Sequence, residues 1–298
     1  MSDQDRQSPF EGTLAKIETW PDVEKPVLVV CLDGWIDAGF AAQNALGLLM
    51  SSMPSQIVAR FDSDELIDYR ARRPVMRIVN GLDTELRWSE IQLHSATNRT
   101  GRTVLILAGP EPDMRWHRFL DEMASIAKAL QVEEVFCLGA FPAPVPHTRP
   151  VSLVGTSTDS ERAARVGFLP ATVDVPSGIS GALEVTMGEA GIPAVGLWAR
   201  VPHYAAAMPY PAAASALLQG LARHAGIEVD TSALDLAAQT TTSQIEQLIA
   251  GSEEHATMVR QLEAQHDAEV AQEPAELDNL PSGDEIAAEL ERFLRGER

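Results

Sequence analysis

The chain has 298 residues, of which 45% are hydrophobic, and a formal net charge of −20 at pH 7. This length supports a large core with an accessory part, and the negative charge argues against binding to nucleic acid or to anionic membrane surfaces. Residues 1–9 are polar and no stretch has the roughly 20 apolar residues that cross a bilayer, so we expect a cytoplasmic protein.

Short apolar runs without polar alternation predict strands that are covered on both faces. These runs span residues 27–32, 104–107, 135–138, 151–154 and 194–198. Helical patterns with apolar residues three and four apart span residues 40–49, 116–130, 178–189 and 211–224. Strands joined through helices pair in parallel by right-handed crossovers, so we predict an α/β fold. Its form is a three-layer αβα sandwich with a mostly parallel central sheet.

Residues 56–93 interrupt this alternation of strands and helices with a predicted β-hairpin insertion. Residues 56–61 and 75–79 have strand patterns, and Asn80 and Gly81 supply the positive φ angles of a tight turn before a less regular stretch at 85–93. We place the insertion at about 73–93. A projecting hairpin has exposed edges, which predicts self-association. The alternative is that it folds back on its own sheet as an antiparallel edge.

Beyond residue 230 the sequence predicts only helices. One long pattern covers 241–269, with Ser243 and Glu246 as a capping box, and a short helix follows Pro281. From residue 240 to the end there are fourteen acidic and four basic residues, about half of the net negative charge. We therefore divide the chain into a core, residues 1–232, and an acidic helical extension, residues 233–298, which we expect to lie across the strand ends as a lid.

Ligands of parallel α/β sheets bind at the carboxyl ends of the strands. There the sequence places Asp33 and Asp37, which could form an acid and base pair, together with His147 and His203 as candidate bases. The alternatives remain open. Asp33 could instead cap the following turn, and each histidine follows a proline and could order its loop.

The segment 177–181 reads SGISG and opens a predicted helix, where exposed backbone N–H groups could bind an anion. Its glycines could equally serve close packing against the sheet. The spacing matches no nucleophile elbow, P-loop or dinucleotide fingerprint. Cys31 and Cys137 lie in apolar runs and are expected to be buried, and neither a metal site nor a cofactor is predicted.

Five segments, taken in order, resemble the PAC2 (proteasome assembly chaperone 2) family in its actinobacterial form. They are VLVVCLDGWIDAG at 27–39, LAGPEPD at 107–113, VFCLGAF at 135–141, PVPHTRP at 144–150 and SGISG at 177–181. The resemblance covers about residues 26–226, and the helical tail resembles the extension of the actinobacterial branch. It implies a core like that of nucleoside phosphorylases, a hairpin used in oligomer contacts, a helical lid over a ligand cleft, and homotrimers.

On this basis the predicted cleft joins residues from several strand ends. It comprises Asp33, Gly34, Trp35, Asp37, Glu111, Pro142, His147, Ser177, Gly178, Ser180, Gly181 and His203. Relatives that engage the proteasome core end in a hydrophobic-Tyr-X tail, whereas this chain ends FLRGER. Docking on the proteasome by that mode is therefore not expected.

Two functions of different class follow. We favour an oligomeric protein or ligand binder of the assembly-chaperone type, because no catalytic signature is present. The alternative is an enzyme with a phosphorylase-like or hydrolase-like reaction on a small polar ligand, carried by the carboxylates and histidines of the cleft.

Overall fold

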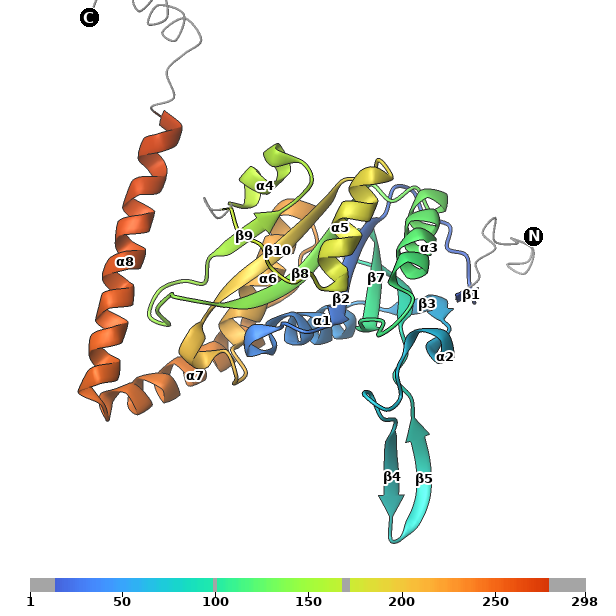
Figure 1. The fold of residues 1–298 in the computed structure, drawn as a ribbon, viewed down its shortest axis with the longest axis horizontal. Coiled ribbons are helices and arrows are strands. Elements are labelled where there is room, and N and C mark those ends of the chain that lie inside the picture. Colours follow the sequence, from blue (N-terminus) through green and yellow to red (C-terminus); the bar gives the residue numbers. More distant parts are fainter. Residues whose placement is uncertain (1–13, 99–100, 168–171, 279–298) are drawn as a thin grey trace, which may run out of the picture.

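The computed structural model describes residues 14–98, 101–167 and 172–278, with side chains described up to residue 271 (Figure 1). An eight-stranded sheet in the order β1-β3-β6-β7-β2-β8-β10-β9 forms the centre, and β4 and β5 form a separate two-stranded sheet. The strands are β1 (Ala15–Ile17), β2 (Val27–Asp33), β3 (Ser55–Phe61), β4 (Val75–Val79), β5 (Leu82–Arg87), β6 (Gln92–Thr97), β7 (Thr103–Pro110), β8 (Glu134–Ala143), β9 (Leu153–Thr156) and β10 (Ala194–Pro202).

The helices connect and cover these strands. They are α1 (Ala41–Ser52), α2 (Ser63–Leu66), α3 (Trp116–Ala129), α4 (Ser160–Val166), α5 (Ile179–Glu189), α6 (Pro211–Ala225), α7 (Ser232–Ala250) and α8 (Glu253–Asp278), with short 3₁₀ turns η1 (Ala38–Phe40) and η2 (His203–Ala205). The four helices predicted within the core correspond to α1, α3, α5 and α6. Within the described residues, no helix is long and apolar enough to span a membrane.

Strand direction agrees with the predicted mixed α/β sheet. The central strands β7, β2, β8 and β10 pair in parallel, and β3 points the same way because it is antiparallel to β6, which is antiparallel to β7. Five of the eight strands therefore share one direction, while β1, β6 and β9 run against it. The prediction of a buried parallel strand at 151–154 is wrong, because β9 starts at Leu153 and pairs antiparallel at the edge of the sheet.

The two faces of the sheet are covered by different helices, as the alternation along β2 shows. Leu28 and Val30 lie in the core that α3 and α5 close, whereas Val27 and Val29 lie in the core that α1 and α6 close. All four are at most 1% exposed. Figure 1 shows the two helical layers on either side of the sheet. This is why the strand read as an unbroken apolar run.

The hairpin is confirmed, with corrected bounds. β4 and β5 pair around Asn80 and Gly81, whose φ angles are 51° and 82° as a two-residue turn with left-handed residues requires. The two strands form their own sheet and stand clear of the body (Figure 1), so the fold-back alternative is excluded. The stretch 85–93 was wrongly taken as one arm, because β5 ends at Arg87 and β6 starts at Gln92 in the large sheet.

The tail also differs from its predicted bounds. Instead of one helix over 241–269 there are two, broken at Gly251 and Ser252, and Ser243 lies inside α7 rather than at its start. The cap is Ser252, whose hydroxyl accepts the N–H of His255 at 3.4 Å. The short helix predicted after Pro281 and the final residues lie outside the described part of the chain. Ile245 of α7 is buried in the α1–α6 core, which fixes this helix to the body.

The parallel strands do not end at one level. β2 pairs with β8 only as far as Val30 opposite Cys137, whereas β8 stays paired with β10 up to Ala143 opposite Pro202. The loops after β8 and β10 therefore start farther out than the loop after β2, and this separates the site residues into two groups.

Candidate functional site

The first group lies where the loop after β2 meets the start of α5. Glu111 follows β7, and its backbone N–H donates to the carbonyl of Asp33 at 2.9 Å. Its side-chain Oε2 accepts the N–H of Ile179 at 3.2 Å. A Cβ on Gly34 would lie 3.0 Å from this oxygen, and one on Gly178 would lie 3.3 Å from the Trp35 ring. We call Gly34, Trp35, Glu111 and Gly178 the Glu111 cluster.

Gly178, which the sequence left undecided between packing and ligand contact together with Gly181, packs closely against the Trp35 ring. The amino terminus of α5, expected to be open to an anion, has the carboxylate of Glu111 against the N–H of its first residue. The positive end of the helix dipole therefore has a charge partner within the protein. Trp35 is 55% exposed and closes one side of the cluster with an apolar surface.

Asp33 lies beside this cluster, between a basic partner and the carboxylate of Asp37, whose pKa its charge raises. Its Oδ2 is 3.9 Å from Nη1 of Arg72, whose Nε donates to Asp113 at 3.1 Å. The Asp33 side chain is 57% exposed. It caps no helix within the described residues. The predicted cap of the turn after β2 is instead provided by another residue.

That residue is Asp37, four positions later. Its two carboxylate oxygens accept the N–H groups of Ala42 at 2.9 Å and Gln43 at 3.1 Å, in the first turn of α1. Burial raises the pKa of Asp37, and the hydrogen bonds from the backbone oppose that rise. Both oxygens of Asp37 hold the turn, and the charge of Asp33 adds to the rise in the pKa of Asp37.

The second group, which we call the His147 cluster, comprises His147, His203 and Tyr204. The Tyr204 hydroxyl accepts the backbone N–H of His147 at 2.9 Å and lies 2.8 Å from its Nδ1. The other ring nitrogen of His147, Nε2, is buried and has no hydrogen-bond partner within the described residues. Burial lowers the pKa of His147 although Glu246 and Glu263 oppose it. His203 is exposed, and its ring contacts Tyr204 edge-on.

Helix α8 packs over this cluster through charged side chains. Arg149 makes two hydrogen bonds of 2.8 Å to Asp267, and Thr148 donates to Glu263 at 2.5 Å. Arg200 lies 3.3 Å from Glu269. Val259 and Leu262 of the same helix are buried. The acidic face of α8 is therefore matched by two arginines at the ends of β8 and β10.

The remaining predicted residues occupy the rim. Pro142 and Ser177 are exposed, and the Ser177 hydroxyl donates to the carbonyl of Gly178 at 2.9 Å. Ser180 accepts a hydrogen bond from the thiol of Cys137 through its carbonyl, at 3.6 Å. Gly181 adjoins Ser177, because a Cβ there would lie 2.7 Å from that hydroxyl.

The two clusters share one edge of the sheet but are not joined by side chains. Within the described residues, no side-chain hydrogen bond or ion pair links the Glu111 cluster to the His147 cluster. The turns nearest each other are tied by the backbone, since Gly39 donates to Ala206 at 2.8 Å and accepts from Tyr210 at 2.9 Å. The candidate bases thus pair with Tyr204 or solvent, and the candidate carboxylates pair with backbone or arginine.

Sequence reasoning gave no role to Tyr204 and did not name Glu184. Tyr204 stood next to a named histidine, which was the available signal. Glu184 gave none, because it sits within the apolar pattern of α5. It is 5% exposed, and its Oε2 accepts the hydroxyl of Thr156 at 2.7 Å, which in turn accepts from Trp198 Nε1 at 3.0 Å. Burial raises the pKa of Glu184 to about 7.

Exposed aromatic and hydrogen-bonded polar side chains lie together at this edge. In the part of the chain that the structure describes, no group of three or more His, Cys, Asp or Glu side chains is arranged to hold a metal ion. Exposed aromatic side chains, Trp35 at 55% and Phe40 at 50%, stand beside hydrogen-bonded polar groups. Such a combination suits recognition of a protein or of a small ligand.

Comparisons with known proteins give the family and the fold of this chain. The model of the PAC2 family matches residues 31–249. A Corynebacterium glutamicum structure of unknown function is 34% identical over 87% of this chain and 98% of its own, with a TM-score of 0.82. The Mycobacterium tuberculosis proteasome-assembly chaperone homologue Rv2125 is 35% identical over 78% of this chain and 99% of its own, with a TM-score of 0.73. A comparison with curated proteins gave no match.

Proposed function

Because the chain belongs to the PAC2 family, we propose that it is a non-catalytic homotrimer that binds a partner at its carboxyl edge in the manner of an assembly chaperone. The relative from M. tuberculosis named as a proteasome-assembly chaperone homologue supports this role. The proposed setting is the cytoplasm, and the two buried free cysteines fit a reducing compartment. Docking of a hydrophobic-Tyr-X tail on the proteasome is not part of the proposal.

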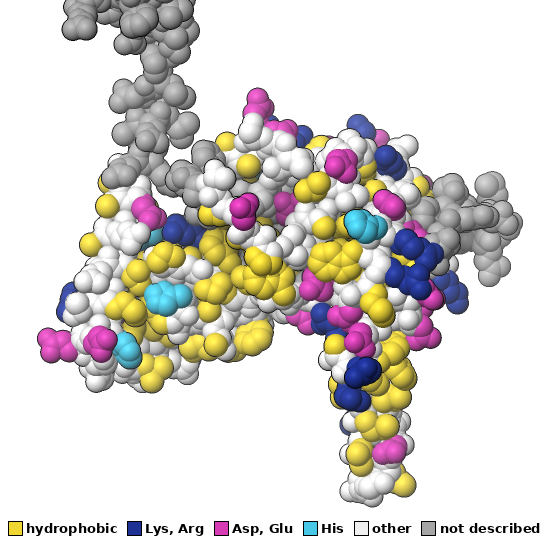
Figure 2. All heavy atoms as spheres, viewed as in Figure 1, with side chains coloured by type: hydrophobic (Ala, Val, Ile, Leu, Met, Phe, Trp, Pro, Cys, Tyr) yellow, Lys and Arg dark blue, Asp and Glu magenta, His cyan; other side chains and the backbone are white. Residues whose placement is uncertain are grey.

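The observation that carries the proposal is the hairpin. Every residue of β4 and β5 is exposed, although many are apolar (Figure 2). The exposed fractions are 56% for Val75, 46% for Met76, 63% for Ile78, 42% for Val79, 70% for Leu82 and 41% for Leu86. Two apolar pairs face each other across the strands, Met76 with Leu86 and Val79 with Leu82.

Such a hairpin gains stability only from a surface that covers it. An isolated two-stranded sheet is marginal in water, and contiguous apolar patches mark interaction sites. A second copy of the chain is the partner always present at matching concentration. The resemblance to the family implies three copies, that is, a homotrimer.

Light scattering after size exclusion tests the assembly. We expect the wild type at three times the chain mass of 32.2 kDa, and the double variant Met76→Glu, Leu86→Glu at 32.2 kDa. The matched control is Leu248→Glu on α7, which also places a carboxylate at an exposed leucine, 72% exposed, and should leave the trimer intact. A monomeric wild type, or a double variant that remains trimeric, would refute the proposed interface.

We place partner binding at Trp35 and Phe40, next to the Glu111 cluster, with α7 and α8 as a lid over the His147 cluster. The test is purification of tagged protein from its native host, wild type beside Trp35→Ser. A specific partner should be recovered with the wild type and lost with the variant while the trimer persists. Recovery of the same proteins with both would remove Trp35 from the binding surface.

A further inference from the structure

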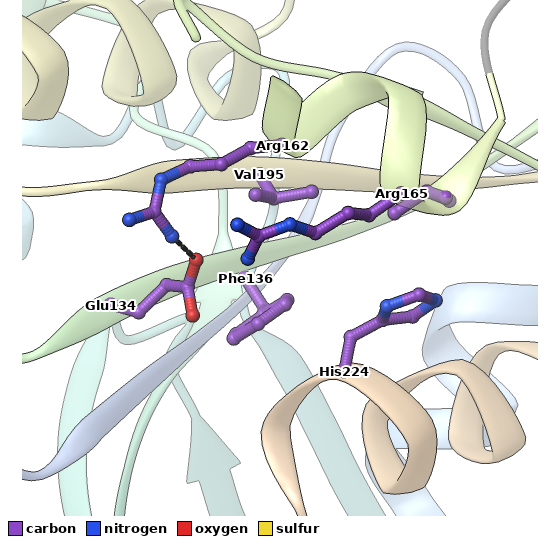
Figure 3. A pocket seen from close by; sticks show the side chains of 7 residues that line it. Glu134, Phe136, Arg162, Arg165, Val195 and His224 are labelled. Atoms are coloured by element: carbon purple, nitrogen blue, oxygen red, sulfur yellow. Dashed lines mark hydrogen bonds and ion pairs between the residues drawn. The ribbon is translucent and has the colours of Figure 1, made fainter. Parts of the chain in front are cut away.

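We propose that a cavity at the amino-terminal edge of the sheet binds a phosphate group, held by Arg165 of α4 and His224 of α6, while Arg223 of α6 lines an adjoining hollow that His224 also lines. The cavity lies at the edge opposite the Glu111 and His147 clusters, because Glu134 opens β8 and Val195 is the second residue of β10. Figure 3 shows Arg165 extending over Phe136 toward the pair of Arg162 and Glu134, with His224 on the other side of Phe136.

The charge of this cavity is positive after its internal pairing is taken into account. Arg162 is neutralised by Glu134, with which it forms an ion pair, and also lies 3.3 Å from Asp159 (Figure 3). Arg165 and Arg223 form no hydrogen bond or ion pair within the described residues. Two guanidinium groups without such a partner, one lining each of two adjoining cavities, are notable in a chain with a net charge of −20.

His224 lines both cavities, one together with Arg165 and the other together with Arg223. Burial lowers the pKa of His224, and the charges of Arg223 and Arg165 lower it further. The other charged groups lining the cavity are Arg162 and Glu134, which compensate each other. His224 is therefore neutral at pH 7 and offers one ring N–H as a donor, while the site lacks an anion.

The dimensions suit one oxyanion. The cavity has a volume of about 40 Å³. At roughly 10–15 Å³ for each water, this corresponds to about three water molecules, which is the size of a phosphate group rather than of a whole cofactor. A neighbouring hollow of about 160 Å³ shares Val166 and His224 and is also lined by Arg223. It gives room for the organic part of a phosphomonoester.

Phosphate fits these groups better than a carboxylate does. Guanidinium forks donate paired hydrogen bonds to phosphate oxygens, and phosphate carries about −1.5 to −2 charges near neutral pH against two arginines. The bound dianion would also stabilise the protonated form of His224. Binding should therefore raise the pKa of His224.

Calorimetric titration at pH 7 and low salt tests the site with inorganic phosphate, glycerol phosphate and succinate. We expect saturable binding of phosphate, weakened at least tenfold in Arg165→Gln and in Arg223→Gln, since a hydrogen bond to a charged group contributes about that factor. Arg260→Gln is the control, because this arginine lies on α8 and its side chain donates to Thr257 within its own helix. Tighter binding of glycerol phosphate than of inorganic phosphate identifies an ester as the ligand, and equal binding identifies free phosphate.

A second readout follows the His224 ring proton by NMR through a pH titration. Phosphate should move its midpoint upward in the wild type and leave it unmoved in Arg165→Gln. Absence of saturable binding, equal affinity in wild type and both variants, or tighter binding of succinate than of phosphate would overturn the assignment.

Discussion

Glu184 makes the folding stability of this protein depend on pH in a calculable way. Burial raises its pKa from 4.5 to about 7. Below pH 4.5 the carboxyl group is protonated in both the folded and the unfolded chain. Between pH 4.5 and 7 the unfolded chain releases the proton while the folded chain keeps it, which favours unfolding. Above pH 7 both forms are ionised and the cost stays constant.

The magnitude follows from these two values. One pH unit between them corresponds to about 1.4 kcal/mol, so Glu184 should remove about 3 kcal/mol from the free energy of unfolding between pH 4.5 and 7. The variant Glu184→Gln cannot ionise and should lack this loss. Urea unfolding of both proteins at pH 4.5, 5.5, 6.5 and 7.5 measures it, because the comparison subtracts every group that the two proteins share.

Thr156→Val provides the matched test. The Thr156 hydroxyl donates to the carboxylate at 2.7 Å and lowers the pKa of Glu184, so its loss should extend the fall in stability to higher pH. Parallel stability curves for wild type and Glu184→Gln across this range would show that Glu184 ionises normally, and would refute the reasoning.

Three further predictions concern the two clusters and the core. Tyr204→Phe should cost about 1–3 kcal/mol in urea unfolding, because it leaves the backbone N–H of His147 unpaired; an unchanged midpoint would contradict that bond. Phe119→Ala should cost about 3–5 kcal/mol, since this side chain is 0% exposed, and a loss below 1 kcal/mol would contradict its packing. Ion pairs with Arg149 and Arg200 hold α8 against the body of the protein. Salt at 1 M screens charges beyond about 3 Å, so it should speed amide hydrogen exchange in α8. Exchange that does not depend on salt would contradict this.

The sequence predicted the centre of the fold well because covered parallel strands leave a strong apolar signal. The strands at 27–32, 104–107, 135–138 and 194–198 all appear in β2, β7, β8 and β10. The antiparallel flank was harder. β6 (Gln92–Thr97) mixes polar and apolar residues and follows an irregular connection, so its pattern merged with that of the hairpin.

The sequence placed the candidate residues at one edge of the sheet but did not show that they form two groups. The rule of strand ends brought Asp33, Glu111, His147 and His203 to one edge correctly. It could not show that the carboxyl ends of β8 and β10 extend beyond that of β2, because strand length depends on pairing with a neighbouring strand. It also could not foresee that the backbone would use both oxygens of Asp37. Spacing along the chain carries no information on either point.

Because of the order of strands in the sheet, β2 is synthesised well before the strands that pair with it. β2 ends at Asp33, but its two neighbours are β7, which starts at Thr103, and β8, which starts at Glu134. At about 5–20 residues per second, the ribosome needs roughly 4–14 s to deliver the first of these neighbours. During that interval β2, the most apolar segment of the chain, has left the exit tunnel while neither strand that pairs with it has been made. The nascent chain itself therefore requires protection from aggregation.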